Sequence, residues 1–131
     1  MILLDTNAWL AWVDDPSRLS RRAKAAIRRE EDLKGIIVSA ASAWEIAIKV
    51  AIQKLGLARP TREWIAAASA YPGVEVRPIS PPEILESCEL PPGLPRDPFD
   101  RLIVGLARHL DVAVVTSDTG IRRYPHVRSI W

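Results

Sequence analysis

Short, unbroken apolar runs, each followed at once by small polar or acidic residues, constrain the fold more than any other feature of this sequence. The first run, Ile2-Leu3-Leu4, leads directly into Asp5. An apolar run without alternation is typical of a strand that is buried on both faces, as in the middle of a parallel sheet. The pattern recurs at Ile36 to Val38, followed by Ser39, and at Val112 to Thr116, followed by Ser117 and Asp118.

The segments between these runs show helical spacing of apolar residues. Together with the strands they predict an α/β protein with a mostly parallel sheet. We expect helices over Ala8 to Val13 (capped by Thr6 or Asn7), from Ser17 or Ser20 to about Lys34, Ala43 to Leu55 (capped by Ser42), Arg62 to Ala70, Glu83 to Cys88, and from the cap Asp97 to about Leu110. Further strands are expected over 74–79 and, at the sheet edge, over 127–130, with a turn at Gly120.

Length and composition indicate one ordinary globular domain, residues 1–131. The formal net charge of +2 is only weak support for a nucleic-acid partner. The single cysteine, Cys88, excludes an internal disulfide, favours a reducing compartment and is expected to be buried. No signal peptide or membrane-spanning run is visible, so we expect a cytoplasmic protein that is not bound to a membrane.

Four acids fall at comparable positions in this framework. Asp5 and Asp118 follow strands, whereas Glu45 and Asp100 lie early in predicted helices. Parallel strands with right-handed crossovers bring all of these positions to one sheet edge. Carboxylates that converge there repel one another unless a cation neutralises them, and an all-oxygen site favours Mg²⁺ or Mn²⁺. The alternative is that each acid is a separate helix cap or surface ion pair, which explains Asp97 well and would suffice for Asp5.

A hard cation held by carboxylates suits phosphodiester hydrolysis, because it activates a bound water and polarises the phosphoryl oxygen. Polar side chains near the acids are candidates to orient them or the water: Thr6, Asn7, Ser39, Thr116 and Ser117. Candidate contacts to an anionic chain are Lys49, Arg96 and Arg101.

Two further basic segments allow two interpretations. The helix before Lys34 carries Arg and Lys residues over positions 18–29, which form either a solvated face or, less simply, a phosphate-contacting surface. The C-terminal segment is also basic, with Arg122, Arg123, His126 and Arg128 interleaved with Tyr124 and Trp131. Trp12 and Trp131 are candidates to stack on bases, although we favour a protein interface for at least one of them.

Four ordered motifs resemble the PIN-domain ribonucleases of the VapC toxin type, the toxin half of VapBC toxin–antitoxin pairs. They span nearly the whole chain: Leu4-Asp5-Thr6-Asn7, Ser42-Ala43-Trp44-Glu45-Ile46-Ala47-Ile48-Lys49, Asp97-Pro98-Phe99-Asp100-Arg101-Leu102-Ile103 and Thr116-Ser117-Asp118. One departure is visible, because Pro95 stands where relatives often have a histidine.

The resemblance implies an α/β/α sandwich around a parallel sheet and a Mg²⁺- or Mn²⁺-dependent endoribonuclease that acts on RNA. It also implies a homodimer and inhibition by an antitoxin protein whose tail covers the acidic site. Residue by residue, it assigns metal binding to Asp5, Glu45, Asp100 and Asp118, with Asp97 as an auxiliary acid.

Other functions remain open alongside the nuclease. A PIN-like scaffold that binds RNA or protein without catalysis is the main alternative, and it would be favoured by the loss of an acid. A 5′-nuclease or phosphatase-like use of the same acids is a second alternative. The sequence has no long insertion to arch over the site and no Gly-rich phosphate loop, which argues against flap-nuclease and P-loop chemistry.

Overall fold

The three apolar runs form neighbouring strands of one parallel sheet in the computed structural model, which describes residues 1–131. The sheet has the order β3-β2-β1-β4-β5. The strands are β1 (Ile2–Leu4), β2 (Ile36–Ser39), β3 (Val74–Arg77), β4 (Ala113–Val115) and β5 (Ser129–Ile130). β1 lies in the centre, where Leu3 is in register with Ile37 of β2 and Val114 of β4. The predicted burial of the N-terminal strand on both faces is therefore confirmed.

Helices occupy the connections between the strands. They are α1 (Thr6–Asp14), a 3₁₀ turn (Pro16–Arg18), α2 (Arg21–Asp32), α3 (Ala40–Ala51), α4 (Thr61–Ser69), α5 (Pro81–Cys88), α6 (Pro98–Leu110) and α7 (Thr119–Arg123). None of them combines the length and the apolar character that crossing a membrane requires.

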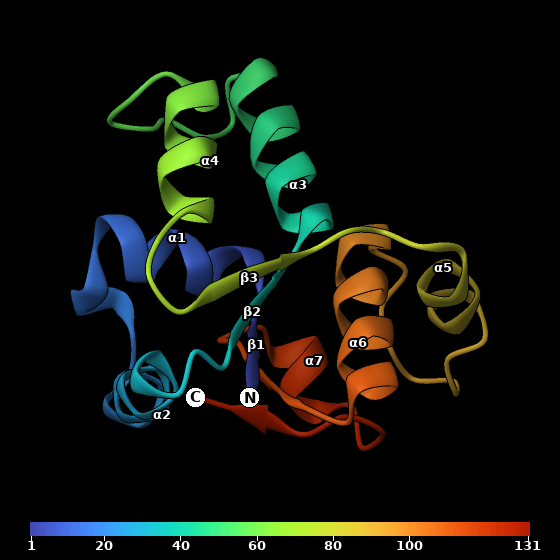
Figure 1. Ribbon diagram of the computed structural model, residues 1–131. Helices are drawn as coiled ribbons and strands as arrows, with labels where there is room; N and C mark the ends of the chain where they lie inside the picture. The colour runs from blue at the N-terminus through green and yellow to red at the C-terminus, as the bar shows by residue number, and fades with distance from the viewer.

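The alternation of side chains along β1 divides the core between the two faces of the sheet. Ile2 and Leu4 pack with Trp9 of α1 and Ile27 of α2, whereas Leu3 packs on the opposite face with Ile103 of α6. Figure 1 shows α1, α2 and α4 on one side of the sheet and α6, α5 and α7 on the other. The architecture is the predicted α/β/α sandwich.

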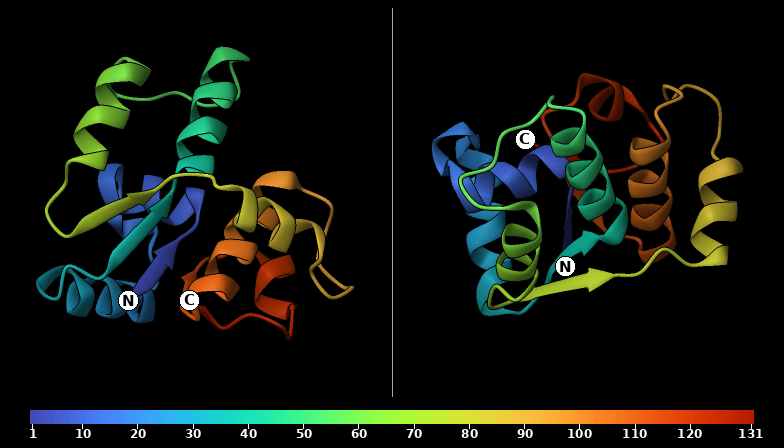
Figure 2. Two further views of the ribbon diagram at one scale, coloured as in Figure 1. Left: turned by 45° about the vertical axis from the view of Figure 1, so that its right-hand side comes forward. Right: turned by 90° about the horizontal axis from the view of Figure 1, so that it is seen from above.

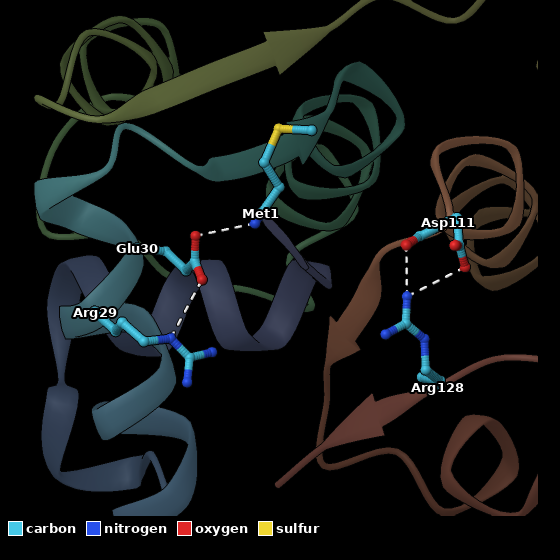
Figure 3. Close-up of polar contacts among 5 residues, drawn as sticks. All are labelled: Met1, Arg29, Glu30, Asp111 and Arg128. Carbon is cyan, nitrogen blue, oxygen red and sulfur yellow. Dashed lines mark hydrogen bonds and ion pairs between the residues drawn. The ribbon is translucent and has the colours of Figure 1, made fainter.

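An ion pair with a buried carboxylate fastens the beginning of β1 to α2. Glu30 is 6% exposed, and its carboxylate accepts from the N-terminal ammonium of Met1 at 3.0 Å and from Arg29 Nε at 3.3 Å (Figure 3). The bond to the N-terminal ammonium, more than any other cause, lowers the pKa of Glu30. A Cβ at Gly35 would lie only 2.5 Å from the Glu30 carboxylate, so any side chain at this position would displace that carboxylate.

α3 begins earlier than the sequence suggested. The expected helix Ala43 to Leu55 with Ser42 as its cap is wrong, because α3 starts at Ala40 and Ser39 is the cap. The Ser39 hydroxyl accepts from the backbone N–H of Ala41, so the helix follows β2 without a loop. This early start places Ser42 inside the helix, where it is fully buried.

Two other expectations, the turn at Gly120 and the burial of Cys88, are wrong. The turn expected at Gly120 is part of the short helix α7, which Asp118 caps by accepting from Ile121 N at 2.9 Å. Cys88 is exposed rather than buried, because it is the last residue of α5 and α5 turns Ser87 toward α6.

Candidate active site

The structure gives Asp5 the two roles that the sequence left as alternatives. Its Oδ1 accepts from the backbone N–H of Ala8 at 2.7 Å, which caps α1. Its other carboxylate oxygen accepts from the Thr116 hydroxyl at the end of β4. The residue is only 4% exposed, so both oxygens are held in place beside the central strand.

Thr116 connects Asp5 to Asp118. While its hydroxyl donates to Asp5, the same oxygen accepts from the backbone N–H of Asp118 at 3.0 Å. Asp118 in turn caps α7. One buried hydroxyl thus fixes the relative positions of the acids that follow β1 and β4.

The remaining acids come from the helices α3 and α6. Glu45 is 8% exposed and accepts from Lys49 Nζ at 2.9 Å, one turn further along α3. Asp97 caps α6 by accepting from the backbone N–H groups of Phe99 and Asp100, and Asp100 lies in the first turn of the helix. Figure 2 shows the beginning of α3 next to α6, as the direct contacts between these helices require.

These residues converge on one pocket of about 190 Å³ that has no hydrophobic lining residue. All five acids named from the sequence line it, together with Thr6, Asn7 and Lys49: Asp5, Glu45, Asp97, Asp100 and Asp118. Separate surface caps would not share a single pocket, so the structure favours a common site over the alternative of unrelated helix caps.

Crowding and burial shift the protonation of two of these acids. Burial raises the pKa of Asp5 to about 6, with smaller increases from Asp118 and Glu45, against the opposing effect of the Thr116 hydrogen bond. Burial also raises the pKa of Asp100 to about 7, with further increases from Asp97, Asp118, Glu45 and Asp5. Near pH 7 the negative charge of these carboxylates is therefore not balanced by positive charge within the protein.

The donor set fits a hard divalent cation, because oxygen ligands whose charges raise one another's pKa gain most from a nearby positive ion. The side chains are not arranged as a finished metal centre, since no three His, Cys, Asp or Glu residues form a ready cluster. Lys49 instead supplies the positive charge nearest to Glu45. Ligation would therefore require the carboxylates to reorient, with Glu45 exchanging its lysine partner for the ion.

The other polar candidates divide into two groups. Thr6 donates from its hydroxyl to Ser42 Oγ at 3.1 Å, which joins α1 to α3 beneath the pocket. Ser42, which the sequence offers as a helix cap, instead lies three residues before Glu45 inside α3 and contacts Thr6. Ser39 caps α3, and Ser117 is exposed, so neither lines the pocket.

The predicted basic contacts also differ in position. Lys49 lines the pocket, whereas Arg96 is exposed outside it. Arg101 donates from Nε to the Ser87 backbone carbonyl at 3.1 Å and does not line it either. The stacking candidates Trp12 and Trp131 are partly buried against the main core cluster.

An aromatic pair beside the pocket was not anticipated. Trp44 and Phe99 immediately precede Glu45 and Asp100 in sequence, and their rings meet edge to face with centroids 5.2 Å apart. Trp44 remains 55% exposed in spite of this contact. This pair joins the second turn of α3 to the first turn of α6 and so positions the two acids relative to each other.

Comparison with known proteins agrees with this geometry. The family model described as PIN domain matches residues 2–127. Ribonuclease VapC22 of Mycobacterium tuberculosis is 31% identical over 129 residues, which cover 98% of this chain and 95% of that protein. The chain therefore belongs to the PIN domain family.

Solved structures share the fold at lower identity. VapBC2 from Rickettsia felis, bound to a promoter DNA fragment, matches with a TM-score of 0.71 and 17% identity over 98% of this chain and 97% of the other. A toxin–antitoxin complex from Klebsiella pneumoniae matches with a TM-score of 0.63 and 17% identity, over 97% and 95% of the two chains.

Proposed function

We propose that this protein is a Mg²⁺- or Mn²⁺-dependent endoribonuclease that acts as the toxin of a toxin–antitoxin pair. The convergence of five acids on one pocket, two of them with raised pKa values, carries this proposal. The similarity to a protein named as a VapC ribonuclease, and the family membership, support the same activity.

Asp5, Glu45, Asp100 and Asp118 would hold the ion, with Asp97 as an auxiliary acid. When bound, the ion supplies an acidified water and a Lewis acid for the phosphoryl oxygen. Thr116 keeps Asp5 and Asp118 in fixed orientation through its two hydrogen bonds, while the bond between Thr6 and Ser42 holds α1 against α3. Lys49, once released from Glu45, is placed to contact a phosphate of the strand.

The proposal includes two protein partners. An antitoxin would cover the acidic pocket, consistent with the antitoxin complexes among the similar folds. A second copy of the chain would form a homodimer, which light scattering of the purified protein tests directly.

The deciding experiment is cleavage of total RNA by the purified chain with Mg²⁺, with Mn²⁺ and with chelator. Asp5→Asn is the inactivating variant, and Asp32→Asn, at the exposed end of α2, is the matched control. We expect discrete metal-dependent products from the parent and the control, and none from Asp5→Asn.

Absence of cleavage with every metal, while RNA binding is retained, would replace the nuclease with the non-catalytic binding module. Cleavage that Asp5→Asn leaves unchanged would show that the acidic pocket is not the active site.

A further inference from the structure

A second hollow, of about 440 Å³, lies at the β5 edge of the sheet between α2 and α7. Three arginines dominate its lining, which comprises Arg22, Thr119, Arg122, Arg123, Ser129 and Trp131. α2 covers one face of the sheet and α7 the other (Figure 1). Residues of both helices and of the β5 end line the hollow, which therefore lies across this edge of the sheet.

The three arginines have no acidic partner within the protein. None of the ion pairs or side-chain hydrogen bonds of the structure involves Arg22, Arg122 or Arg123. In a different hollow, Arg108 and Arg128 are neutralised by Glu86 and Asp111. Like charges gathered without counterions repel, and a bound polyanion relieves that repulsion.

The basic hollow begins where the acidic pocket ends. Asp118 lines the acidic pocket and caps α7, and the next residue, Thr119, lines the basic hollow. Arg122 follows Asp118 by one helical turn, a rise of about 6 Å along the axis. A flexible anionic strand leaving the acidic pocket along α7 would therefore meet these arginines first.

Trp131 adds an apolar wall to the same hollow. It is partly buried and packs against the main core cluster, so the ring is held in place rather than free in solvent. Guanidinium groups beside a fixed aromatic ring are the combination that single-stranded nucleic acid requires, because phosphates pair with the cations and bases stack on the ring.

We propose that this hollow binds the phosphates of single-stranded RNA on one side of the scissile bond. The inference rests on the proposed nuclease function, which it deepens by assigning a path to the strand. It also explains how RNA approaches an acidic pocket that would otherwise repel it. An acidic segment of a partner protein, such as the antitoxin proposed to cover the acidic pocket, is the competing occupant, but its carboxylates do not stack on the indole ring as bases do.

The test is binding of a fluorescein-labelled, mixed-sequence RNA of about twelve nucleotides, within the range of single-strand site sizes. All proteins carry Asp5→Asn to prevent cleavage, and titrations are run in chelator over a series of potassium chloride concentrations. The test variant adds Arg122→Ala and Arg123→Ala. The matched control adds Arg59→Ala and Arg62→Ala, two exposed, unpaired arginines at or near α4, far from α7 (Figures 1 and 2).

We expect the test variant to bind RNA roughly tenfold more weakly than the control at low salt. Its log–log salt slope should also be smaller by about 1.4, the value for two lost single-strand phosphate contacts. Substituting Trp131 with Ala should weaken binding without changing the slope, because stacking releases no counterions.

Equal affinities and slopes for the test and control variants would overturn the inference. So would loss of binding to a polyglutamate probe by the test variant while RNA binding is unaffected, which would assign the hollow to an acidic protein segment. If the parent cleaves no RNA with any metal yet the arginine dependence persists, the nuclease proposal fails and the RNA-binding site stands.

Discussion

Thr116 shows how a single side chain organises this site. It is fully buried, and its one oxygen both donates to Asp5 and accepts from the Asp118 backbone. The two acids come from opposite ends of the chain, and this hydroxyl connects them directly. Asp100 lacks any comparable partner, since no hydrogen bond to its side chain offsets the charges around it. It is therefore the acid whose ionisation costs the free protein most.

Asp100→Asn should stabilise the protein in the absence of metal, but only above acidic pH. The folded-state pKa of about 7 lies above the ordinary value of 3.8, so the folded protein retains a proton that the unfolded chain releases. Stability of the parent is thus lost as pH rises from about 4 to about 7. We expect the variant to gain of the order of 1–3 kcal/mol at pH 8 and little at pH 4.

Urea unfolding in chelator at the two pH values measures this difference. The same variant should lose RNA cleavage, which separates stability from activity at one residue. Destabilisation of Asp100→Asn at pH 8 would show that the charge is already compensated within the protein.

At the scale of elements, α5 and α6 are packed unusually closely around Gly105. A Cβ built at Gly105 would lie 3.1 Å from the backbone nitrogen of Ser87 and 3.2 Å from its Cα. Arg101 of α6 donates from Nε to the Ser87 carbonyl at 3.1 Å, which ties α5 to α6 at the same place. The position of α5 therefore depends on the absence of a side chain in the middle of α6.

Gly105→Val should force the two helices apart and destabilise the fold by about 1–3 kcal/mol, the usual cost of overpacking. Gly56→Val is the control, because a Cβ there meets nothing within 4 Å. Thermal unfolding of both variants measures the effect. Equal melting temperatures would mean that α5 moves without cost.

The elements also show where prediction from sequence succeeds and where it stops. β1, β2 and β4 were recognisable because each is an unbroken apolar run. α6 was recognisable because Asp97-Pro98 marks its start and because Ile103 and Leu106, both buried, recur at helical spacing. The start of α3 was missed because Ser39 and Ser42 are equally good caps in sequence, and only the absence of a loop after β2 decides between them. α7 was missed because five residues carry too little periodicity, although Ile121 anchors it fully buried.

The acids of the site were predictable because strand ends and helix starts meet at one edge in any parallel sheet. The side chains that contact these acids were not predictable. Nothing in the sequence reveals that Thr116 rather than Ser117 faces Asp5, or that Arg101 turns to the Ser87 carbonyl instead of the pocket. The grouping of Arg22 with Arg122 and Arg123 was equally hidden, because about a hundred residues separate them and the sheet edge alone brings them together.

At the scale of the whole molecule, divalent metal should act as a stabilising ligand. Mn²⁺ at a hundred times its dissociation constant would raise the free energy of unfolding by about 2.7 kcal/mol. The melting temperature should therefore rise with Mn²⁺ concentration, and more at pH 8 than at pH 5, because Asp5 and Asp100 must lose their protons to bind. Differential scanning calorimetry measures the shift.

The double variant Asp5→Asn with Asp100→Asn should abolish this shift, and Asp32→Asn should retain it. A shift of equal size in the double variant would place the ion elsewhere on the protein.

The central position of β1 has a consequence during synthesis. β1 acquires its second neighbour only when β4, residues 113–115, has been made, and Asp118 follows immediately. At about 5–20 residues per second, the nascent chain spends roughly 5 to 25 seconds with one side of β1 unpaired. Throughout that interval Asp5 lacks both the Thr116 hydroxyl and the neighbouring acid. An unfinished chain therefore lacks the complete acidic pocket, and under the proposed function it should leave the messenger that encodes it uncut.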